Sequence, residues 1–275
     1  MKKNLDKATV DSFGDEWGRF DQSNLPAKEA HEIFDKYFSI FPWKLLPDNA
    51  EGFDLGCGTG RWAKFVAGRV GHLTCIDPSE ALEVAKYNLS DYPNITYLKE
   101  SVNSLSLDSE SQDFGYSLGV LHHVPDTESA IKDCGRLLKK GAPLLLYLYY
   151  AFDNRSVLFK FMWKISDLLR IFISSLPNSI KFIFTDLLAA FIYLPVSKLS
   201  LMLEKLGFVV DNIPLSFYKD CSFYTMRTDS RDRFGTPLEK RFTKDQILTM
   251  MKESGFDNIE FSDSGPFWCV VGIKK

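Results

Sequence analysis

Apolar and polar positions alternate along the chain with two periods, and these periods divide it into four stretches. Residues 1–46 have the helical period, because apolar side chains recur at spacings of three and four residues before Pro42. Residues 50–150 alternate short apolar runs with helical segments, and residues 228–275 hold one helix and two further strands. Residues 151–227 consist mainly of apolar helical runs. The pattern therefore predicts an α/β fold with an additional helical stretch.

The strands and helices of the α/β part can be read from its short apolar runs and the segments between them. Their alternation predicts a parallel sheet with helices on both faces. The predicted strands are 52–55, 72–76, 95–99, 114–118, 143–149, 256–262 and 267–273. The predicted helices are 61–67, 80–89, 127–138 and 243–254.

Charge and composition exclude several classes of protein. The 33 basic and 36 acidic side chains give a net charge of -3, whereas proteins that bind nucleic acid by bulk electrostatics have a basic excess, so we expect no nucleic-acid partner. Disorder is excluded because 45% of residues are apolar and 25% are charged. The five cysteines form no Cys-x-x-Cys pair, which favours buried thiols and no metal site.

The first residues and the longest apolar runs bear on the compartment. The N-terminal sequence MKKNLDKATVDSFGDEW is polar and lacks the apolar core of a signal peptide. Charged residues interrupt the apolar runs, so that none reaches about 18 uninterrupted apolar residues. We therefore expect a cytoplasmic protein without a transmembrane segment.

One segment combines closely spaced glycines with an acidic residue. Residues 53–62 read FDLGCGTGRW, between a predicted strand and a predicted helix. Glycines at such a turn let the backbone approach a ligand closely. The third glycine comes one residue too early for the dinucleotide fingerprint G-x-G-x-x-G, and position 61 is Arg. Asp54, just before the glycines, favours a ligand with a positive centre such as an ammonium group.

A second acidic residue, Asp77, ends the next predicted strand in the sequence CIDPS. An acid at this place can accept hydrogen bonds from both hydroxyls of an adenosine ribose. The alternative is that Asp77 only caps the helix that follows, with Pro78 in its first turn. The glycine loop upstream favours the ribose interpretation.

These motifs, with LGVLHHVPD at 118–126, resemble class I S-adenosylmethionine-dependent methyltransferases, especially those that methylate small molecules. The resemblance is firm over about 50–150, weaker over 240–275, and carries no motif in 151–227. It implies a Rossmann-like seven-stranded methyltransferase sheet with helices on both faces and a helical insertion after the fifth strand. The implied domains are an N-terminal helical segment 1–46, a cofactor-binding domain of 47–150 and 228–275, and an aromatic-rich helical cap 151–227.

The resemblance also implies which residues hold S-adenosylmethionine. Asp54 and the glycine loop would hold the methionine part, and Asp77 would hold the ribose. Ser101 replaces the acid with which the family usually reaches the adenine, so the adenine contact is expected to be weaker. The complete set of expected cofactor contacts is Trp17, Asp54, Gly56, Cys57, Gly58, Gly60, Asp77, Pro78, Ser101, Val102 and Leu118.

Methyl transfer from a sulfonium requires positioning above all, and a base only when the acceptor carries a proton at neutral pH. His123 and His122 follow the fourth predicted strand, at the carboxyl edge where open parallel sheets bind ligands. Either is a candidate base, and the alternative is that both only pack. The polar cluster RTDSRDRF at 227–234 is expected to be a solvated, salt-bridged loop, with a grip on an acidic acceptor as the alternative.

The stretch 151–227 holds 14 of the 39 aromatic residues. Its helices carry narrow polar stripes, so most of their surface must be covered by something. They pack on each other and on the sheet, or wall an apolar acceptor pocket, or attach to a membrane surface. The sequence as a whole predicts methyl transfer from S-adenosylmethionine to a small or lipid-like acceptor under this cap. The alternatives are a protein that binds the cofactor without methyl transfer, and a nicotinamide-dependent oxidoreductase, which Arg61 disfavours. The acceptor atom and the oligomeric state stay open.

Overall fold

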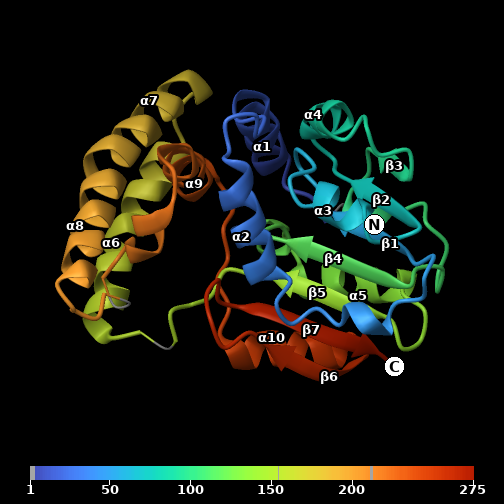
Figure 1. Ribbon diagram of the computed structural model, residues 1–275. Coiled ribbons are helices and arrows are strands. Elements are labelled where there is room, and N and C mark those ends of the chain that lie inside the picture. Colours follow the sequence, from blue (N-terminus) through green and yellow to red (C-terminus); the bar gives the residue numbers. More distant parts are fainter. Residues whose placement is uncertain (1–3, 154, 211–212) are drawn as a thin grey trace. The chain divides into compact units, whose positions relative to one another are not determined.

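The computed structural model describes residues 4–153, 155–210 and 213–275 (Figure 1). The chain folds into two compact units. The first comprises Met1–Gly18, His31–Asp153 and Leu238–Lys275, and the second comprises Arg19–Ala30 and Asn154–Pro237. The second unit thus contains most of the predicted insert together with a short N-terminal segment.

A seven-stranded sheet forms the centre of the first unit, with the strand order β3-β2-β1-β4-β5-β7-β6 (Figure 1). The first five strands pair in parallel, and β7 runs antiparallel to both of its neighbours. The strands are β1 Glu51–Leu55, β2 His72–Ile76, β3 Ile95–Leu98, β4 Phe114–Leu118, β5 Pro143–Tyr147, β6 Phe256–Phe261 and β7 Cys269–Lys274. The predicted seven-stranded α/β fold is confirmed, and β5 ends two residues earlier than predicted.

The sheet has a hydrophobic core on each face, because neighbouring residues of a strand point to opposite sides. In β5, Leu144 and Leu146 belong to one core and Leu145 to the other. The first core includes apolar residues of α5 (Thr127–Leu137) and α10 (Lys244–Glu253). The second includes residues of α2 (Ala27–Tyr37), α3 (Ala63–Ala67) and α4 (Ala81–Asn88). Helices therefore cover both faces, and β5 is apolar throughout, as is typical of a central parallel strand.

The strand order places a topological switch beside β1. The chain runs outward from β1 through β2 to β3, and then returns to the other side of β1 with β4. Loops that follow β1 and β4 leave the sheet in opposite directions at such a point, which opens a crevice at the carboxyl ends of the strands. The glycine loop follows β1 and the two histidines follow β4, so both predicted motifs belong to this edge.

The second unit is helical. It contains α6 (Val157–Ser174), α7 (Asn178–Leu188), a π-helical turn at Ala189–Tyr193, α8 (Leu194–Lys205) and α9 (Phe223–Gly235). The helices from α7 to α8 form one continuous run, Asn178–Lys205, of 28 residues. By length and composition alone, this run could cross a membrane. The sequence predicts no transmembrane segment, because charged residues interrupt its apolar runs. An apolar stretch of 18 residues within this run is 28% buried.

The polar cluster at 227–234 lies within α9, so the prediction of a solvated loop there is wrong. Ser222 caps this helix by accepting a hydrogen bond from the backbone amide of Thr225. Arg231 is fully buried, with its guanidinium 4.4 Å from the centre of the Phe182 ring. Polar side chains of α9 thus face the interior of the helical unit, where they contact aromatic and polar groups.

Candidate active site

The glycine loop has a backbone that only glycine adopts without strain at three positions. Gly56, Gly58 and Gly60 have φ angles of 77°, 53° and 76°. A Cβ atom at Gly56 would lie 2.4 Å from Val120, and one at Gly60 would lie 2.5 Å from Leu89. The loop is also anchored, because the amides of Gly56 and Cys57 donate to the carbonyl of Ile76 at 2.7 and 3.1 Å. The result is a rigid, close-fitting turn beside the end of β2.

Asp54 lies in β1 two residues before the loop and is 3% exposed. Its Oδ2 atom is buried and has no hydrogen-bond partner among the described residues. Burial raises the pKa of Asp54 to about 8; the neighbouring Tyr116 hydroxyl partly offsets this rise, and the charge of Asp77 adds to it. A buried acceptor oxygen without a donor is costly, so the position suits a ligand that brings a donor.

Asp77 follows β2, and its carboxylate links the loop to the start of the next segment. Its Oδ2 accepts from the amide of Gly58 at 2.9 Å, and its Oδ1 accepts from the amide and the hydroxyl of Ser79 at 2.8 and 2.6 Å. Helix α4 begins only at Ala81 with Glu80 as its N-cap, so Asp77 does not cap that helix. These contacts occupy three of about four acceptor positions of the carboxylate. A ribose would therefore meet one free position rather than two.

Trp17 belongs to α1 (Lys7–Arg19) and lies at the glycine loop. A Cβ atom at Gly58 would lie 3.5 Å from the indole Nε1 of Trp17. The guanidinium of Arg61 is 5.8 Å from the centre of the Trp17 ring and 4.2 Å from that of Trp62. Within the first unit, the N-terminal helix thus covers the outer side of the loop.

The other expected cofactor contacts lie on the loops around this edge. Ser101 precedes a 3-10 turn at Val102–Ser104, and its hydroxyl interacts with Asn103 Oδ1 at 3.0 Å and Ser104 Oγ at 2.9 Å. Val102 is buried, while Pro78 and Leu118 are half-buried. The neighbouring Cys75 thiol and burial together raise the pKa of Cys57 well above its ordinary value, which disfavours the reactive thiolate.

The two histidines after β4 differ in their surroundings. His122 is fully buried and stacks on the Tyr149 ring with centroids 3.8 Å apart. Burial lowers the pKa of His122 well below its ordinary value, and the positive charges of His123 and Arg241 add to the effect. His123 is 4% exposed, with its Nδ1 2.6 Å from the carbonyl of Leu238. A carbonyl only accepts, so Nδ1 donates, and Nε2 is the basic nitrogen of the neutral ring.

The sequence did not single out three residues that shape this site: Tyr116, Ser79 and Tyr149. Tyr116 is the β4 residue in register with Asp54 and is fully buried, and Ser79 fixes the Asp77 carboxylate. A signal for Ser79 was present, because Asp-x-Ser is a common turn in which the acid accepts from the residue two positions on. The positions of Tyr116 beside Asp54 and of Tyr149 beside His122 can be recognised only from the folded structure.

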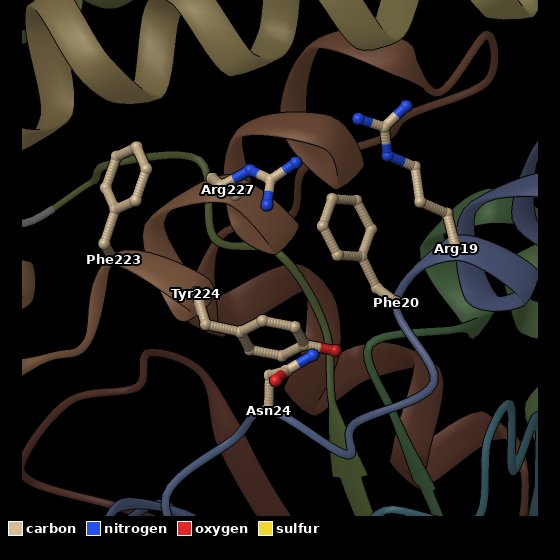
Figure 2. Close-up of a pocket in the computed structure, with 6 residues that line it drawn as sticks. All are labelled: Arg19, Phe20, Asn24, Phe223, Tyr224 and Arg227. Carbon is tan, nitrogen blue, oxygen red and sulfur yellow. The ribbon is translucent and has the colours of Figure 1, made fainter.

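A separate pocket of about 390 Å³ lies in the second unit (Figure 2). Its lining consists of Arg19, Phe20, Asn24, Phe223, Tyr224 and Arg227. Both arginines bind one carboxylate, Asp186: Arg19 Nη2 at 3.0 Å, and Arg227 through Nε at 2.9 Å and Nη2 at 2.8 Å. Two cations against one anion leave this pocket with a positive excess.

The residues of the first unit fit the cofactor that the resemblance implies. The unpartnered oxygen of Asp54 suits the ammonium of a methionine group, and the glycine loop leaves its backbone open to close approach at Gly58. Among the described residues, no group of three or more His, Cys, Asp or Glu side chains has the arrangement of a metal site.

Known proteins similar to this chain were found by sequence and by structure. Residues 53–146 match the family described as "Methyltransferase domain". The ubiquinone biosynthesis O-methyltransferases of Hahella chejuensis and Dechloromonas aromatica are 30% and 32% identical over 145 and 146 residues. These alignments cover 52% of this chain and 61% and 63% of the relatives, so the chain spans about three fifths of their length. A crystal structure of a SAM dependent methyltransferase from Aquifex aeolicus is similar in fold, with a TM-score of 0.51, 11% identity, and coverage of 93% of this chain and 95% of that one.

Proposed function

We propose that the chain is a class I S-adenosylmethionine-dependent methyltransferase that transfers a methyl group to a small or lipid-like acceptor, which the match of residues 53–146 to the family described as "Methyltransferase domain" supports. The observation that carries the proposal is the buried oxygen of Asp54 without a donor, next to a loop of three glycines with positive φ. Bound S-adenosylmethionine supplies a methyl group that is already activated on a sulfonium. The chain's own task is then to bind, orient and shield the reactants.

We assign the binding roles as follows. The Asp54 carboxylate accepts hydrogen bonds from the ammonium of the cofactor, and the backbone at Gly56, Gly58 and Gly60 lies against its methionine part. Asp77 accepts from one ribose hydroxyl, since its remaining acceptor positions already bind Gly58 and Ser79. Trp17 covers the loop. Cys57, Pro78, Ser101, Val102 and Leu118 complete the proposed contacts.

We propose that the acceptor is a hydroxyl group and that His123 removes its proton. The relatives are named as O-methyltransferases, which supports an oxygen acceptor. The Leu238 carbonyl holds the Nδ1 hydrogen of His123, so Nε2 is left as the base. His122 is the weaker candidate, because its burial lowers its pKa and with it its basicity.

Calorimetric titration with S-adenosylmethionine, S-adenosylhomocysteine and a nicotinamide dinucleotide tests the cofactor assignment. We expect both sulfur compounds to bind and the dinucleotide not to bind. Asp54→Asn should weaken S-adenosylhomocysteine binding by about thirtyfold, because a charged hydrogen bond contributes about 1.5–3 kcal/mol. The control Asp91→Asn makes the same chemical change at an exposed position and should bind like the wild type. Binding of the dinucleotide alone would overturn the proposal.

Transfer of a radiolabelled methyl group to a panel of phenols, amines and carboxylates tests the acceptor class. We expect methylated phenols. His123→Gln should lower kcat, while KM for the cofactor stays unchanged. Methylation of amines only, or an unchanged kcat in the variant, would contradict the base assignment.

A further inference from the structure

Exposed apolar side chains are concentrated in the helical unit. Among the described residues, 24 large hydrophobic side chains are exposed, and 22 of these lie between Val157 and Phe223. Helix α6 alone exposes nine, which include Val157 at 83% and Leu168 at 69%. The run from α7 to α8 adds more, with Phe191 at 74%. Large exposed apolar patches mark surfaces that bind a protein partner or a membrane.

The interior of the same unit is unusually polar. The buried residues of α6 include Arg170, whose Nε binds Asp167 at 2.6 Å and whose Nη1 donates to the carbonyls of Thr236 and Pro237 at 3.2 and 3.1 Å. In α7, Lys181 is 5% exposed and donates to the carbonyl of Gly235 at 3.3 Å. Among the described residues, the hydrophobic cluster inside the helical unit contains four buried side chains: Ile173, Tyr193, Met226 and Phe234.

The polarity of these helices is therefore the reverse of the usual arrangement. In water an amphipathic helix buries its apolar side and exposes its charges. Here the exposed residues of α6 recur mostly at spacings of three and four, which places them on one side, while the charged Arg170 faces inward. Lys181, Thr185, Ser197 and Ser200 are likewise the buried residues of α7 and α8. This arrangement is favourable where the surroundings are hydrocarbon rather than water.

Charge distinguishes the helical unit from the rest of the chain. The unit contains 13 Lys and Arg against 9 Asp and Glu, although the whole chain is acidic. Lys164, Lys198 and Lys205 are exposed on the helices that carry the apolar residues. Basic residues beside an apolar helical face are the combination that binds anionic lipid headgroups.

We propose that α6, α7 and α8 dock on an anionic lipid bilayer, with their exposed apolar side chains at the boundary between headgroups and acyl chains. The helices lie on the membrane rather than cross it, because the polar side of the run Asn178–Lys205 is covered by protein. Ser230 of α9, for example, donates to the carbonyl of Thr185 at 2.9 Å. This proposal rests on the helical unit alone and does not depend on the proposed methyl transfer.

Flotation of the full-length protein with vesicles in a density gradient tests the docking. We expect the protein to float with vesicles of equal parts phosphatidylglycerol and phosphatidylcholine, and to float less with phosphatidylcholine alone or at high salt. The double variant Leu168→Ser, Phe191→Ser should lower the partition into vesicles by at least about a hundredfold, since two large apolar side chains leave the membrane. The matched control is Leu45→Ser, Tyr87→Ser, which removes two side chains of the first unit that are 61% and 82% exposed, and it should float like the wild type.

Three results would overturn the proposal. The protein stays at the bottom of the gradient with both kinds of vesicle, or floats equally well with both, or forms a dimer in light scattering that the Leu168→Ser, Phe191→Ser variant dissociates. The third result would assign the apolar faces to a second copy of the chain. Calorimetric titration with S-adenosylhomocysteine should give the same affinity for the double variant as for the wild type. Loss of vesicle binding at unchanged cofactor affinity separates this proposal from the proposed function.

Discussion

Asp54 should destabilise the ligand-free protein at neutral pH, and Asp54→Asn should relieve this. Burial raises the pKa of Asp54 from 3.8 to about 8 in the folded state. Between about pH 4 and pH 8 the folded protein therefore keeps a proton that the unfolded chain has already lost. Where the folded state binds more protons, the free energy of unfolding falls as pH rises, by about 1.4 kcal/mol for each pH unit.

The size of the effect follows from these two pKa values. The difference between 3.8 and about 8 corresponds to about 6 kcal/mol at pH 8 and above, and to about 4 kcal/mol at pH 7. These values are ceilings, because the asparagine amide also needs hydrogen-bond partners when it is buried. Below about pH 4 the carboxyl is protonated in both states, so its pKa shift there carries no penalty.

Urea unfolding of both proteins at pH 5, 7 and 9 without cofactor measures this effect. We expect the stability of Asp54→Asn relative to the wild type to increase steadily with pH, while its affinity for S-adenosylhomocysteine is lower. Addition of S-adenosylhomocysteine at pH 8 should stabilise the wild type more than the variant. Parallel pH dependences of the two proteins would refute the claim that Asp54 is held protonated by burial. Equal affinities would refute its contact with the ammonium group.

Gly60→Ala should lower the thermal midpoint, because Gly60 has a φ of 76° and its Cβ would lie 2.5 Å from Leu89; the expected loss is about 1–3 kcal/mol. Gly68→Ala is the control, since Gly68 has a φ of -72° and no heavy atom within 4 Å of an added Cβ, and an equal loss there would contradict the steric argument. Ser79→Ala should weaken S-adenosylhomocysteine binding about fivefold in calorimetry, since the 2.6 Å hydrogen bond from its hydroxyl to Asp77 is lost. The ring signals of His122 should not titrate in NMR spectra between pH 8 and pH 5, because burial lowers its pKa, and a midpoint near 6.5 would show that the ring is open to water. Near pH 6.5 the unfolded chain binds a proton on His122 whereas the folded protein does not. The free energy of unfolding therefore falls as pH falls below about 6.5.

The sheet and the glycine loop were predictable because local sequence determines them. Buried parallel strands are short apolar runs in the sequence. The loop has φ above 50° at three positions, and glycine is the residue that adopts such angles without strain. The carboxyl edge then follows from chain order, which brings the loop after β1 and the histidines after β4 to one end of the sheet. The residues that tune this site were not predictable in the same way. Tyr116 lies beside Asp54 only through the register of β1 and β4, and the stacking of Tyr149 on His122 depends on where β5 ends.

The cluster at 227–234 shows a different limit of sequence reasoning. Seven of its eight residues are charged or hydroxyl-bearing, and a segment of that composition between apolar helices predicts a solvated turn. In α9 the same side chains find partners inside the helical unit: Arg227 binds Asp186, Ser230 donates to the Thr185 carbonyl, and Arg231 lies over the Phe182 ring. Partners that distant in sequence leave no local pattern.

Helical periodicity in a sequence indicates that a helix has an apolar and a polar side, but it does not indicate which of the two sides faces water. In α5 the apolar residues of the periodic pattern join the core of the sheet, as Ala130, Ile131 and Cys134 do. In α6 an equally regular pattern turns Arg170 inward and leaves Leu168 69% exposed. The difference lies in the partners that are available, since α5 has an apolar sheet to cover and α6 packs on the polar helix α9. The membrane proposal therefore depends on which side is buried, an observation independent of the residues assigned to the cofactor. Each proposal can fail while the other stands.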